Sequence, residues 1–357
     1  MKHKWLFLLL AIMLAVSVGL IGCGDDEEEA TPTPAVTATP APATATPPPA
    51  KPTITLSDLN WGSAHFGTQV AKLIIEEGYG YPVELQSGAT IALFTATRSG
   101  DVDVFIEGWL QNQQAAYDEA MAAGDIELLN FMNDDNFQSL FVVPTYVIEG
   151  DAERGIEPMA PDLASIDDLP DYIDLFADPE APGKGRIVTC VPGWECEIIN
   201  AAQLVAYGLE DDYNVLSPGS QEALFASLTG AYDKGEAWLG YTWGPTWLSG
   251  KLDLTQLEEP AFDQAVWDEN RGCAYPAVDL FVASHIDFRD KAPEVAEMFE
   301  NWVMDTATLA EALAFMQETE GEPVDAAIWF IKNREDIWTT FVPADVAQKV
   351  RDAVADM

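Results

Sequence analysis

Two cysteines and a tryptophan stand together in the segment 190–196, which reads Cys-Val-Pro-Gly-Trp-Glu-Cys. Pro-Gly is typical of turns, so the sulfurs of Cys190 and Cys196 can close a small loop that holds Trp194 still. The apolar residues that follow predict a helix, whose first amide N–H groups have no partner inside the helix. A rigid indole beside free N–H donors suits a cation that also bears an oxygen anion. The same residues equally fit a structural disulfide that supports a buried tryptophan.

Two further tryptophans, Trp109 and Trp243, each follow a predicted strand. Ligands of open parallel sheets bind beyond the carboxyl ends of the strands, so these indoles and Trp194 are candidates for one site. A quaternary ammonium group has no N–H to donate, but several indole faces can surround its methyl groups, each contact contributing about 0.5 to 2 kcal/mol. Any single tryptophan can instead pack in the core. We expect that of Trp238, Trp267, Trp302, Trp329 and Trp338, whereas Trp61 and Trp247 fit either role.

The elements that must position these residues alternate between strands and helices. Strands are predicted at 53–56, 83–85 and 102–106, with helices at 63–78, capped by Ser63, and at 90–97. This order implies a parallel sheet with helices on its faces.

The alternation restarts near residue 159, where residues 165–168 (Ser-Ile-Asp-Asp) predict a capping box. We therefore expect an α/β clamshell with two crossings between its lobes and the ligand in the cleft. The predicted boundaries are 53–158 for the first part of lobe 1, 159–276 for lobe 2, and 277–357 for the second part of lobe 1, with a helical C-terminus.

The N-terminal residues predict export. Lys2 and Lys4 precede an apolar run that ends in Leu-Ile-Gly-Cys, so residues 1–23 resemble a signal peptide with a lipobox and a lipidated Cys23. Residues 24–52 are rich in Thr, Pro and Ala and predict an extended tether. The expected location is the extracytoplasmic face of the cell membrane, with the protein anchored by lipid. A plain transmembrane anchor is the alternative, because the apolar run is nearly long enough to span a bilayer.

Composition narrows the class of ligand. The 357 residues include 17 Lys and Arg against 60 Asp and Glu, and the net charge of -43 argues against nucleic acid as a partner. A cationic or zwitterionic ligand is compatible with this charge, although solubility alone can account for much of it. Outside the cytoplasm a disulfide persists, which pairs Cys190 with Cys196 and leaves Cys273 as a free thiol. His65 and His285 lack the spacing of metal ligands, so we expect neither metal nor cofactor.

Three features together resemble the ProX-type glycine betaine and proline betaine binding proteins of ABC importers. They are the cysteine loop with Pro-Gly-Trp, the segment 241–247 (Tyr-Thr-Trp-Gly-Pro-Thr-Trp), and a strand that ends in Gly-Trp at 108–109. The resemblance follows the same order over nearly all of the chain after the tether. It implies a type II periplasmic-binding fold, a cage formed by Trp109, Trp194 and Trp243, and a disulfide between Cys190 and Cys196.

The chain departs from the family pattern beside two cage residues. The family has proline and histidine two and four residues after its first cage tryptophan, where this chain has Gln111 and Gln113. Gln113 can donate an amide N–H to a ligand carboxylate but brings no positive charge. Glu195 replaces a glycine; its backbone N–H could bind a carboxylate, but an inward side chain would repel one. Choline therefore stays open beside glycine betaine and proline betaine.

These observations predict a monomeric, lipid-anchored solute-binding protein that captures a quaternary ammonium compound and delivers it to an ABC permease in the membrane. Ligand binding would favour the closed clamshell, since only that state assembles contacts from both lobes. No enzymatic activity is needed. A receptor with the same cage that docks to a membrane signalling protein is one alternative. An exported hydrolase with a carboxylate pair is another, although no spacing singles out such a pair.

Overall fold

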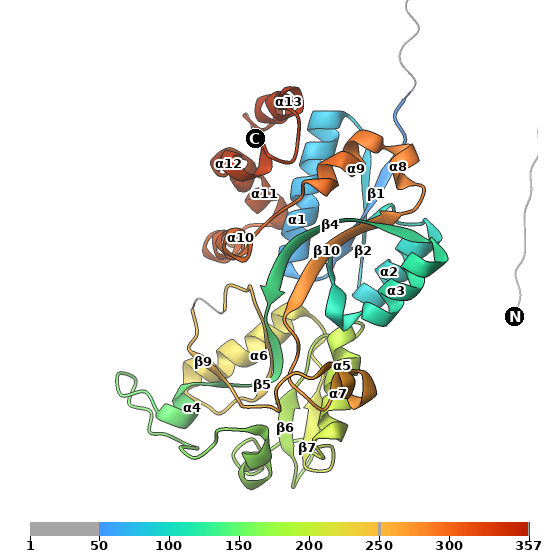
Figure 1. Cartoon of the computed structure of the whole chain (residues 1–357). Coiled ribbons are helices and arrows are strands. Elements are labelled where there is room, and N and C mark those ends of the chain that lie inside the picture. The colour runs from blue at the N-terminus through green and yellow to red at the C-terminus, as the bar shows by residue number, and fades with distance from the viewer. Residues whose placement is uncertain (1–49, 249–250, 356) are drawn as a thin grey trace, which may run out of the picture. The chain divides into compact units, whose positions relative to one another are not determined.

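The computed structural model describes residues 50–248, 251–355 and 357, and residues 50–357 form one unit (Figure 1). The expected signal peptide, Cys23 and nearly all of the expected tether lie outside the described residues. Within the described ranges, no helix has the length and apolar character that a membrane crossing requires.

Two five-stranded sheets with helices around them confirm the α/β fold class. The first sheet has the order β2-β1-β3-β10-β4. Its strands are β1 (Ile54–Leu59), β2 (Val83–Gly88), β3 (Val104–Trp109), β4 (Ile126–Asn136) and β10 (Val278–His285). β1 pairs in parallel with β2 and β3, as the β-α-β-α-β pattern predicted, whereas β10 runs antiparallel to β3 and β4. The helices between these strands are α1 (Gly62–Leu73), the π-helix η1 (Ile74–Tyr79), α2 (Thr90–Ser99), the short η2 (Leu110–Asn112) and α3 (Gln114–Ala123).

The second sheet has the order β7-β6-β8-β5-β9. Its strands are β5 (Gln138–Pro144), β6 (Gly185–Val188), β7 (Tyr213–Leu216), β8 (Gly240–Trp243) and β9 (Leu254–Gln256). The helices of this lobe are α4 (Tyr146–Glu149), η3 (Ile166–Tyr172), α5 (Glu195–Ala206), α6 (Gln221–Lys234) and α7 (Gln264–Asn270).

Strand pairing places the first crossing between the sheets at Phe137, which separates β4 from β5 (Figure 1). This is earlier than the boundary expected at 158/159. The apolar runs 128–132 and 141–148 look alike in the sequence, and only their hydrogen-bond partners assign them to different sheets. The second crossing precedes β10, which begins at Val278, close to the expected boundary at 276/277.

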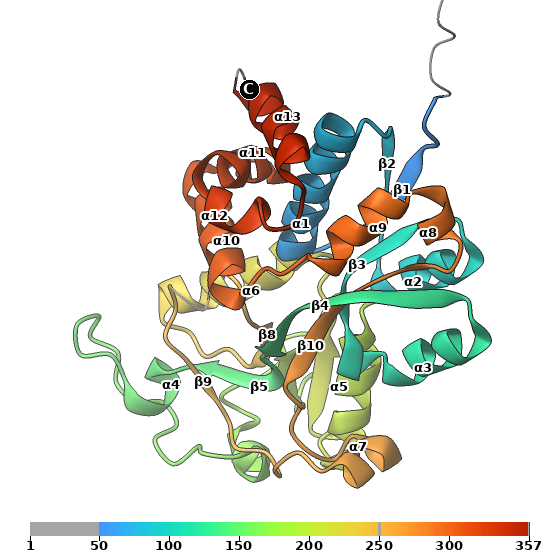
Figure 2. The same cartoon turned by 45° about the horizontal axis from the view of Figure 1, so that its top comes forward.

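The C-terminal helices pack on the first lobe (Figure 2). They are α8 (Phe288–Lys291), α9 (Pro293–Glu300), α10 (Thr306–Thr319), α11 (Pro323–Asn333), α12 (Glu335–Trp338) and α13 (Ala344–Val354). α10 and α11 contact α1, and α13 contacts η1. Trp302 and Trp338 are fully buried in this core, and Trp329 stacks on Phe315 beside it. Trp238 and Trp267 are buried in the other core, so these five tryptophans have the packing role that we expected.

Two predicted helix starts have different outcomes. The capping box at Ser165 and Asp168 is present at the start of η3. The prediction that Ser63 caps α1 is wrong, because the helix begins at Gly62 after Trp61 and no side chain caps it. Ser63 lies in the first turn, where its hydroxyl donates to the carboxylate of Glu107 at 2.6 Å.

Gly108 has no room for a side chain, since an added Cβ would lie 2.3 Å from Cζ of Phe281. We expect Gly108→Ala to lower the free energy of unfolding by about 1 to 3 kcal/mol through overpacking. Gly67→Ala is the matched control, because a Cβ at this helical position meets no atom within 4 Å. It should raise the free energy of unfolding by about 0.5 to 1 kcal/mol. Urea unfolding tests both, and equal midpoints for the two variants would contradict this packing.

Candidate functional site

Four tryptophans line one small cavity. The structure brings together the three candidates, Trp109, Trp194 and Trp243, and adds Trp61 and Tyr241 to the same wall. The cavity has a volume of about 40 Å³, which is the space of a few water molecules. Its other lining residues are Thr90, Asn112, Glu195 and Cys196, so no Lys, Arg or His is found on this wall among the described residues.

Ends of strands from both sheets position the indoles. Trp109 is the last residue of β3, and Trp61 follows the end of β1 by two residues. Trp243 is the last residue of β8 in the other sheet, and Trp194 immediately precedes α5. The carboxyl ends of strands are the usual place for ligands in open α/β sheets. The cavity therefore lies where this topology favours binding.

The rings hold one another in place. Trp194 packs edge to face against Trp61 at a centroid distance of 5.5 Å and against Trp243 at 5.2 Å. Trp243 also stacks on Tyr241 at 5.8 Å and on Phe225 at 5.2 Å. Edge-to-face and offset arrangements are the favoured geometries of aromatic pairs. Trp194 thus links an indole of the first lobe to one of the second.

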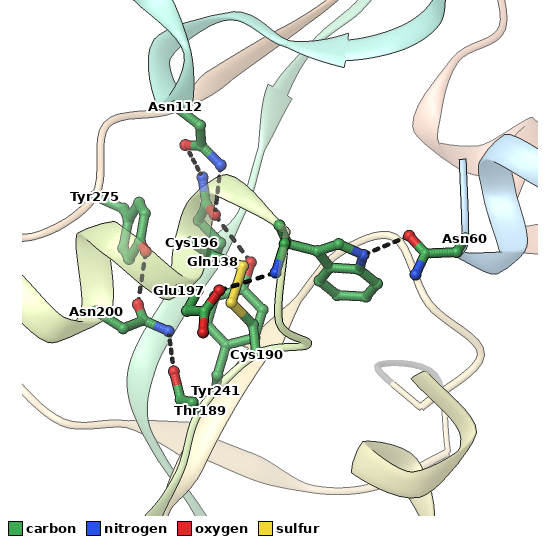
Figure 3. The surroundings of a disulfide bond; sticks show 12 residues. Asn60, Asn112, Gln138, Thr189, Cys190, Cys196, Glu197, Asn200, Tyr241 and Tyr275 are labelled. Carbon is green, nitrogen blue, oxygen red and sulfur yellow. Dashed lines mark hydrogen bonds between the residues drawn. A yellow bond between two sulfur atoms is a disulfide. The ribbon is translucent and has the colours of Figure 1, made fainter. Parts of the chain in front are cut away.

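Hydrogen bonds join the lobes beside the cavity (Figure 3). The Trp194 indole Nε1 donates to Oδ1 of Asn60 at 2.7 Å. Asn112 and Gln138 exchange two amide hydrogen bonds, at 3.1 and 2.7 Å, and the Tyr241 hydroxyl donates to Oε1 of Gln138 at 2.9 Å. The two partners of the Trp194–Asn60 pair and of the Asn112–Gln138 pair lie in different lobes, so these bonds hold the site in a closed arrangement.

The loop before α5 is fixed covalently and by its turn. Cys190 and Cys196 are joined in a disulfide (Figure 3). Gly193 adopts a φ of 86°, a conformation that favours glycine, and its N–H donates to Oε2 of Glu197 at 2.9 Å. Cys273 is a buried free thiol.

The two residues expected near a ligand carboxylate occupy different places. Glu195 is the first residue of α5 and lines the cavity, where burial raises the pKa of its carboxyl. Gln113 lies off this wall and lines a neighbouring cavity, which Glu195 and Asn112 also line. Gln113 is 3% exposed, and neither Oε1 nor Nε2 has a hydrogen-bond partner among the described residues. Asn112, one residue earlier in the same turn, is the amide that reaches the cavity of the tryptophans.

Sequence reasoning missed Glu107, which lies behind the tryptophans. Its Oε1 accepts hydrogen bonds from Trp61 Nε1 and from Ser63 Oγ, both at 2.6 Å. Burial raises the pKa of this carboxyl to about 7. The available signal was an acidic residue directly after the predicted strand 102–106 and directly before Gly108 and Trp109.

Metal ligation finds no support in the geometry of the described residues. No group of three or more His, Cys, Asp or Glu side chains within these ranges could hold an ion. His65 instead bonds Oδ1 of Asp58 through Nδ1 at 2.6 Å.

The disulfide should stabilise the fold measurably. Replacing Cys190 and Cys196 by serine is expected to lower the free energy of unfolding by about 2 kcal/mol, because a short loop is then no longer closed in the unfolded chain. Cys273→Ser is the control, since this buried thiol makes only a weak hydrogen bond to the Asp263 carbonyl. Urea unfolding without reductant measures both. The same loss in the control and the double variant would contradict a special role for the loop.

Comparisons with known proteins agree with this architecture. Residues 52–333 match the family described as the substrate binding domain of ABC-type glycine betaine transport system, OpuAC. The trimethylamine N-oxide-binding protein of Pelagibacter ubique is 26% identical over 297 residues, which cover 82% of this chain and 91% of that protein. The crystal structure of a glycine/betaine/L-proline-binding protein (ProX) from Borrelia burgdorferi has a TM-score of 0.69 at 20% identity, covering 84% of this chain and 99% of the other. An ABC-transporter choline binding protein in complex with choline also has a TM-score of 0.69, at 18% identity, covering 85% of this chain and 98% of the other. The chain therefore belongs to the OpuAC family and is a solute-binding protein with the type II periplasmic-binding fold, not an enzyme.

Proposed function

We propose that this protein captures a small methylated ammonium compound and delivers it to an ABC permease. The observation that carries the proposal is the tryptophan cage, defined as Trp61, Trp109, Trp194, Trp243 and Tyr241 around one cavity. Its wall contributes aromatic faces from both lobes and no basic side chain among the described residues. Such a wall is suited to a cation and offers no ion pair to an anion.

The physical chemistry of the cage matches a methylated nitrogen. A trimethylammonium group has no N–H, so carbonyl or carboxylate acceptors cannot replace its hydration shell with hydrogen bonds. Indole and phenol faces carry negative charge density and attract the methyl groups, with about 0.5 to 2 kcal/mol for each contact. The small cavity excludes most water, which strengthens every electrostatic contact inside it. Several such contacts together can offset the loss of hydration.

The polar part of the wall favours ligands without a carboxylate. Glu195 brings negative charge, whereas the donors on this wall among the described residues are neutral groups such as Thr90, Asn112 and the first N–H groups of α5. A hydroxyl or an N-oxide oxygen can accept from such donors without facing a second carboxylate. Choline and trimethylamine N-oxide, which two of the similar proteins bind by name, fit this wall better than glycine betaine or proline betaine. The carboxylate of a betaine would have to bind the N–H groups at the start of α5, because Gln113 lines the neighbouring cavity instead.

The cage also explains how ligand capture would couple to closure. Trp61 and Trp109 belong to the first lobe, whereas Trp194 and Trp243 belong to the second. A ligand that touches both pairs stabilises the closed state by its extra contacts there. We further propose that the protein acts as a monomer at the extracytoplasmic face of the membrane. The lipobox at Cys23 and the tether at 24–52 support a lipid anchor.

Removing one cage face should weaken binding selectively. We expect Trp109→Ala to raise the Kd for choline at least tenfold in isothermal titration calorimetry, because one cation-π contact and its exclusion of water are lost. Trp329→Ala is the matched control, since Trp329 is also partly buried but stacks on Phe315 in the C-terminal helices. The same Kd for Trp109→Ala and the wild type would rule out the cage.

Glu195 should discriminate between ligands. Glu195→Gln removes a negative charge from the wall, so we expect choline to bind about fivefold more weakly and glycine betaine to bind equally well or more tightly. Glu210→Gln changes the net charge equally at an exposed position and should alter neither Kd. Calorimetric titration of both ligands measures the contrast. A parallel loss for choline and glycine betaine would show that the Glu195 charge does not set specificity.

A further inference from the structure

Glu107 combines burial with an unusual backbone conformation. It is 1% exposed and has a φ of 64°, a left-handed conformation that side chains other than glycine rarely adopt. β3 carries an extra residue here, since Phe281 of β10 pairs with Gly108 whereas Ala283 pairs with Phe105. Bulges of this kind redirect a side chain. The bulge aims the carboxylate at the back of the tryptophan cage.

The contacts of Glu107 connect it to the cage itself. Its Oε1 accepts from Trp61 Nε1 and Ser63 Oγ at 2.6 Å, and the nearby Trp109 indole favours its charged form. Trp61 and Trp109 are the two cage residues of the first lobe. The second oxygen, Oε2, is buried without a hydrogen-bond partner among the described residues. A neutral glutamine could accept the same two hydrogen bonds, so positioning alone does not require a charge at this place.

An ionised carboxylate buried without a cation is costly, and the structure places no basic side chain in hydrogen-bond contact with Glu107 among the described residues. Burial raises the pKa of this carboxyl to about 7, even though its hydrogen bonds oppose the shift. Near neutral pH this carboxyl is therefore present in both its neutral and its charged form. A cation on the far side of the Trp61 and Trp109 rings would favour the charged form.

We propose that Glu107 is a positioning residue that orients the cage indoles and supplies the negative charge that a bound ammonium ion needs, so that proton and ligand compete. This inference rests on the proposed function. An indole whose N–H donates to a carboxylate has a more electron-rich face, which strengthens its attraction for a cation. The carboxylate also acts directly through the field of its charge, which is screened less at a buried position than in water.

Other titratable groups around Glu107 bear on the same equilibrium. His65 on α1 favours the charged form of Glu107. Burial disfavours charge on His65, but its hydrogen bond to Asp58 on β1 and the charges of Asp58 and of Glu222 on α6 outweigh burial and raise its pKa. Glu195 on α5 faces the cage from the other lobe, and burial raises its pKa. His65 and Glu195 are unchanged in Glu107→Gln, so the comparison of this variant with the wild type isolates Glu107.

Charged groups on the remaining neighbouring elements are engaged elsewhere. Asp279 on β10 accepts a hydrogen bond from Gln111 at 3.0 Å. Arg98 on α2 donates to Asp125 at 3.0 Å. Neither bonds Glu107, so His65 is the basic side chain among the described residues whose charge favours the ionised carboxylate, and a bound cation would add to it.

The sign of the pH dependence follows directly. A cation that lowers the pKa of Glu107 binds the ionised form more tightly. Affinity for the cation therefore falls as the pH drops through 7, because binding must then release a proton from Glu107. At pH 6 about one Glu107 carboxyl in eleven is ionised, whereas at pH 8 about ten in eleven are. A site that requires the ionised form therefore binds about tenfold more weakly at pH 6 than at pH 8. Choline keeps its charge over this range and is the suitable probe.

The test is calorimetric titration of the full-length protein with choline at pH 6 and pH 8. The wild type should show the tenfold difference and release protons near pH 7, which is detected as a binding enthalpy that depends on the buffer's ionisation enthalpy. Glu107→Gln should bind about tenfold more weakly than the wild type at pH 8 and lose most of the pH dependence. Glu195→Gln, a charge change on the cage wall itself, should keep the tenfold ratio.

A second variant keeps the test decisive if Glu107→Gln folds poorly. Ser63→Ala removes one donor to the carboxylate, which raises the pKa of Glu107 and should move the midpoint of the affinity profile to higher pH. Choline binding without proton release, or a Glu107→Gln profile that matches the wild type, overturns the role of Glu107 and leaves the proposed function intact. Failure of the wild type to bind choline, glycine betaine and trimethylamine N-oxide at pH 8 overturns the proposed function and the inference with it.

Discussion

The edge-to-face contacts of Trp194 with Trp61 and Trp243 are the interactions on which the rest of the site depends. Through Trp194 they connect Trp61 of the first lobe with Trp243 of the second, so the cavity exists only while the two lobes meet. The disulfide loop fixes the backbone under Trp194, and the bond from its indole N–H to Asn60 fixes the ring across the interlobe boundary. The fold, the disulfide loop and the contact between the lobes together hold the aromatic rings in one arrangement.

Negative charge around the cage adds to the attraction of the aromatic faces for a cation. The chain as a whole carries a net charge of -43, and the cage has Glu195 on its wall and Glu107 behind two of its indoles. A cation gains from each of these features. Among the described residues, an anionic group of a ligand is stabilised only by the neutral hydrogen-bond donors of the cage. The oxygen-bearing end of the ligand is therefore the part that should decide which methylated ammonium compound binds.

The sequence predicted the α/β fold and the tryptophans that converge, because residues at the carboxyl ends of strands share an edge whatever the details of pairing. It did not assign Trp61, whose position after β1 matches that of a residue at a helix start. The role of Glu107 could not be predicted, because neither the bulge nor its left-handed backbone conformation produces a recognisable sequence pattern. In the sequence, Glu107 looks like any other acidic residue near a strand. Gln113 lies one cavity away from the cage because the short η2 turn directs its neighbour Asn112 inward. The predicted boundary at 158/159 differs from the first crossing between the sheets for a related reason. Which sheet a strand joins depends on its hydrogen-bond partners, and these are not visible in the sequence.

In the proposed function, the aromatic faces recognise the positive charge on a methylated group. The most direct measurement compares the Kd of choline with that of its neutral analogue, in which carbon replaces nitrogen and shape is kept. Attraction by the ring faces predicts binding of the neutral analogue at least tenfold weaker than that of choline. Equal affinity for the two would show that the cavity selects an apolar shape alone and would contradict recognition of the cation by the ring faces.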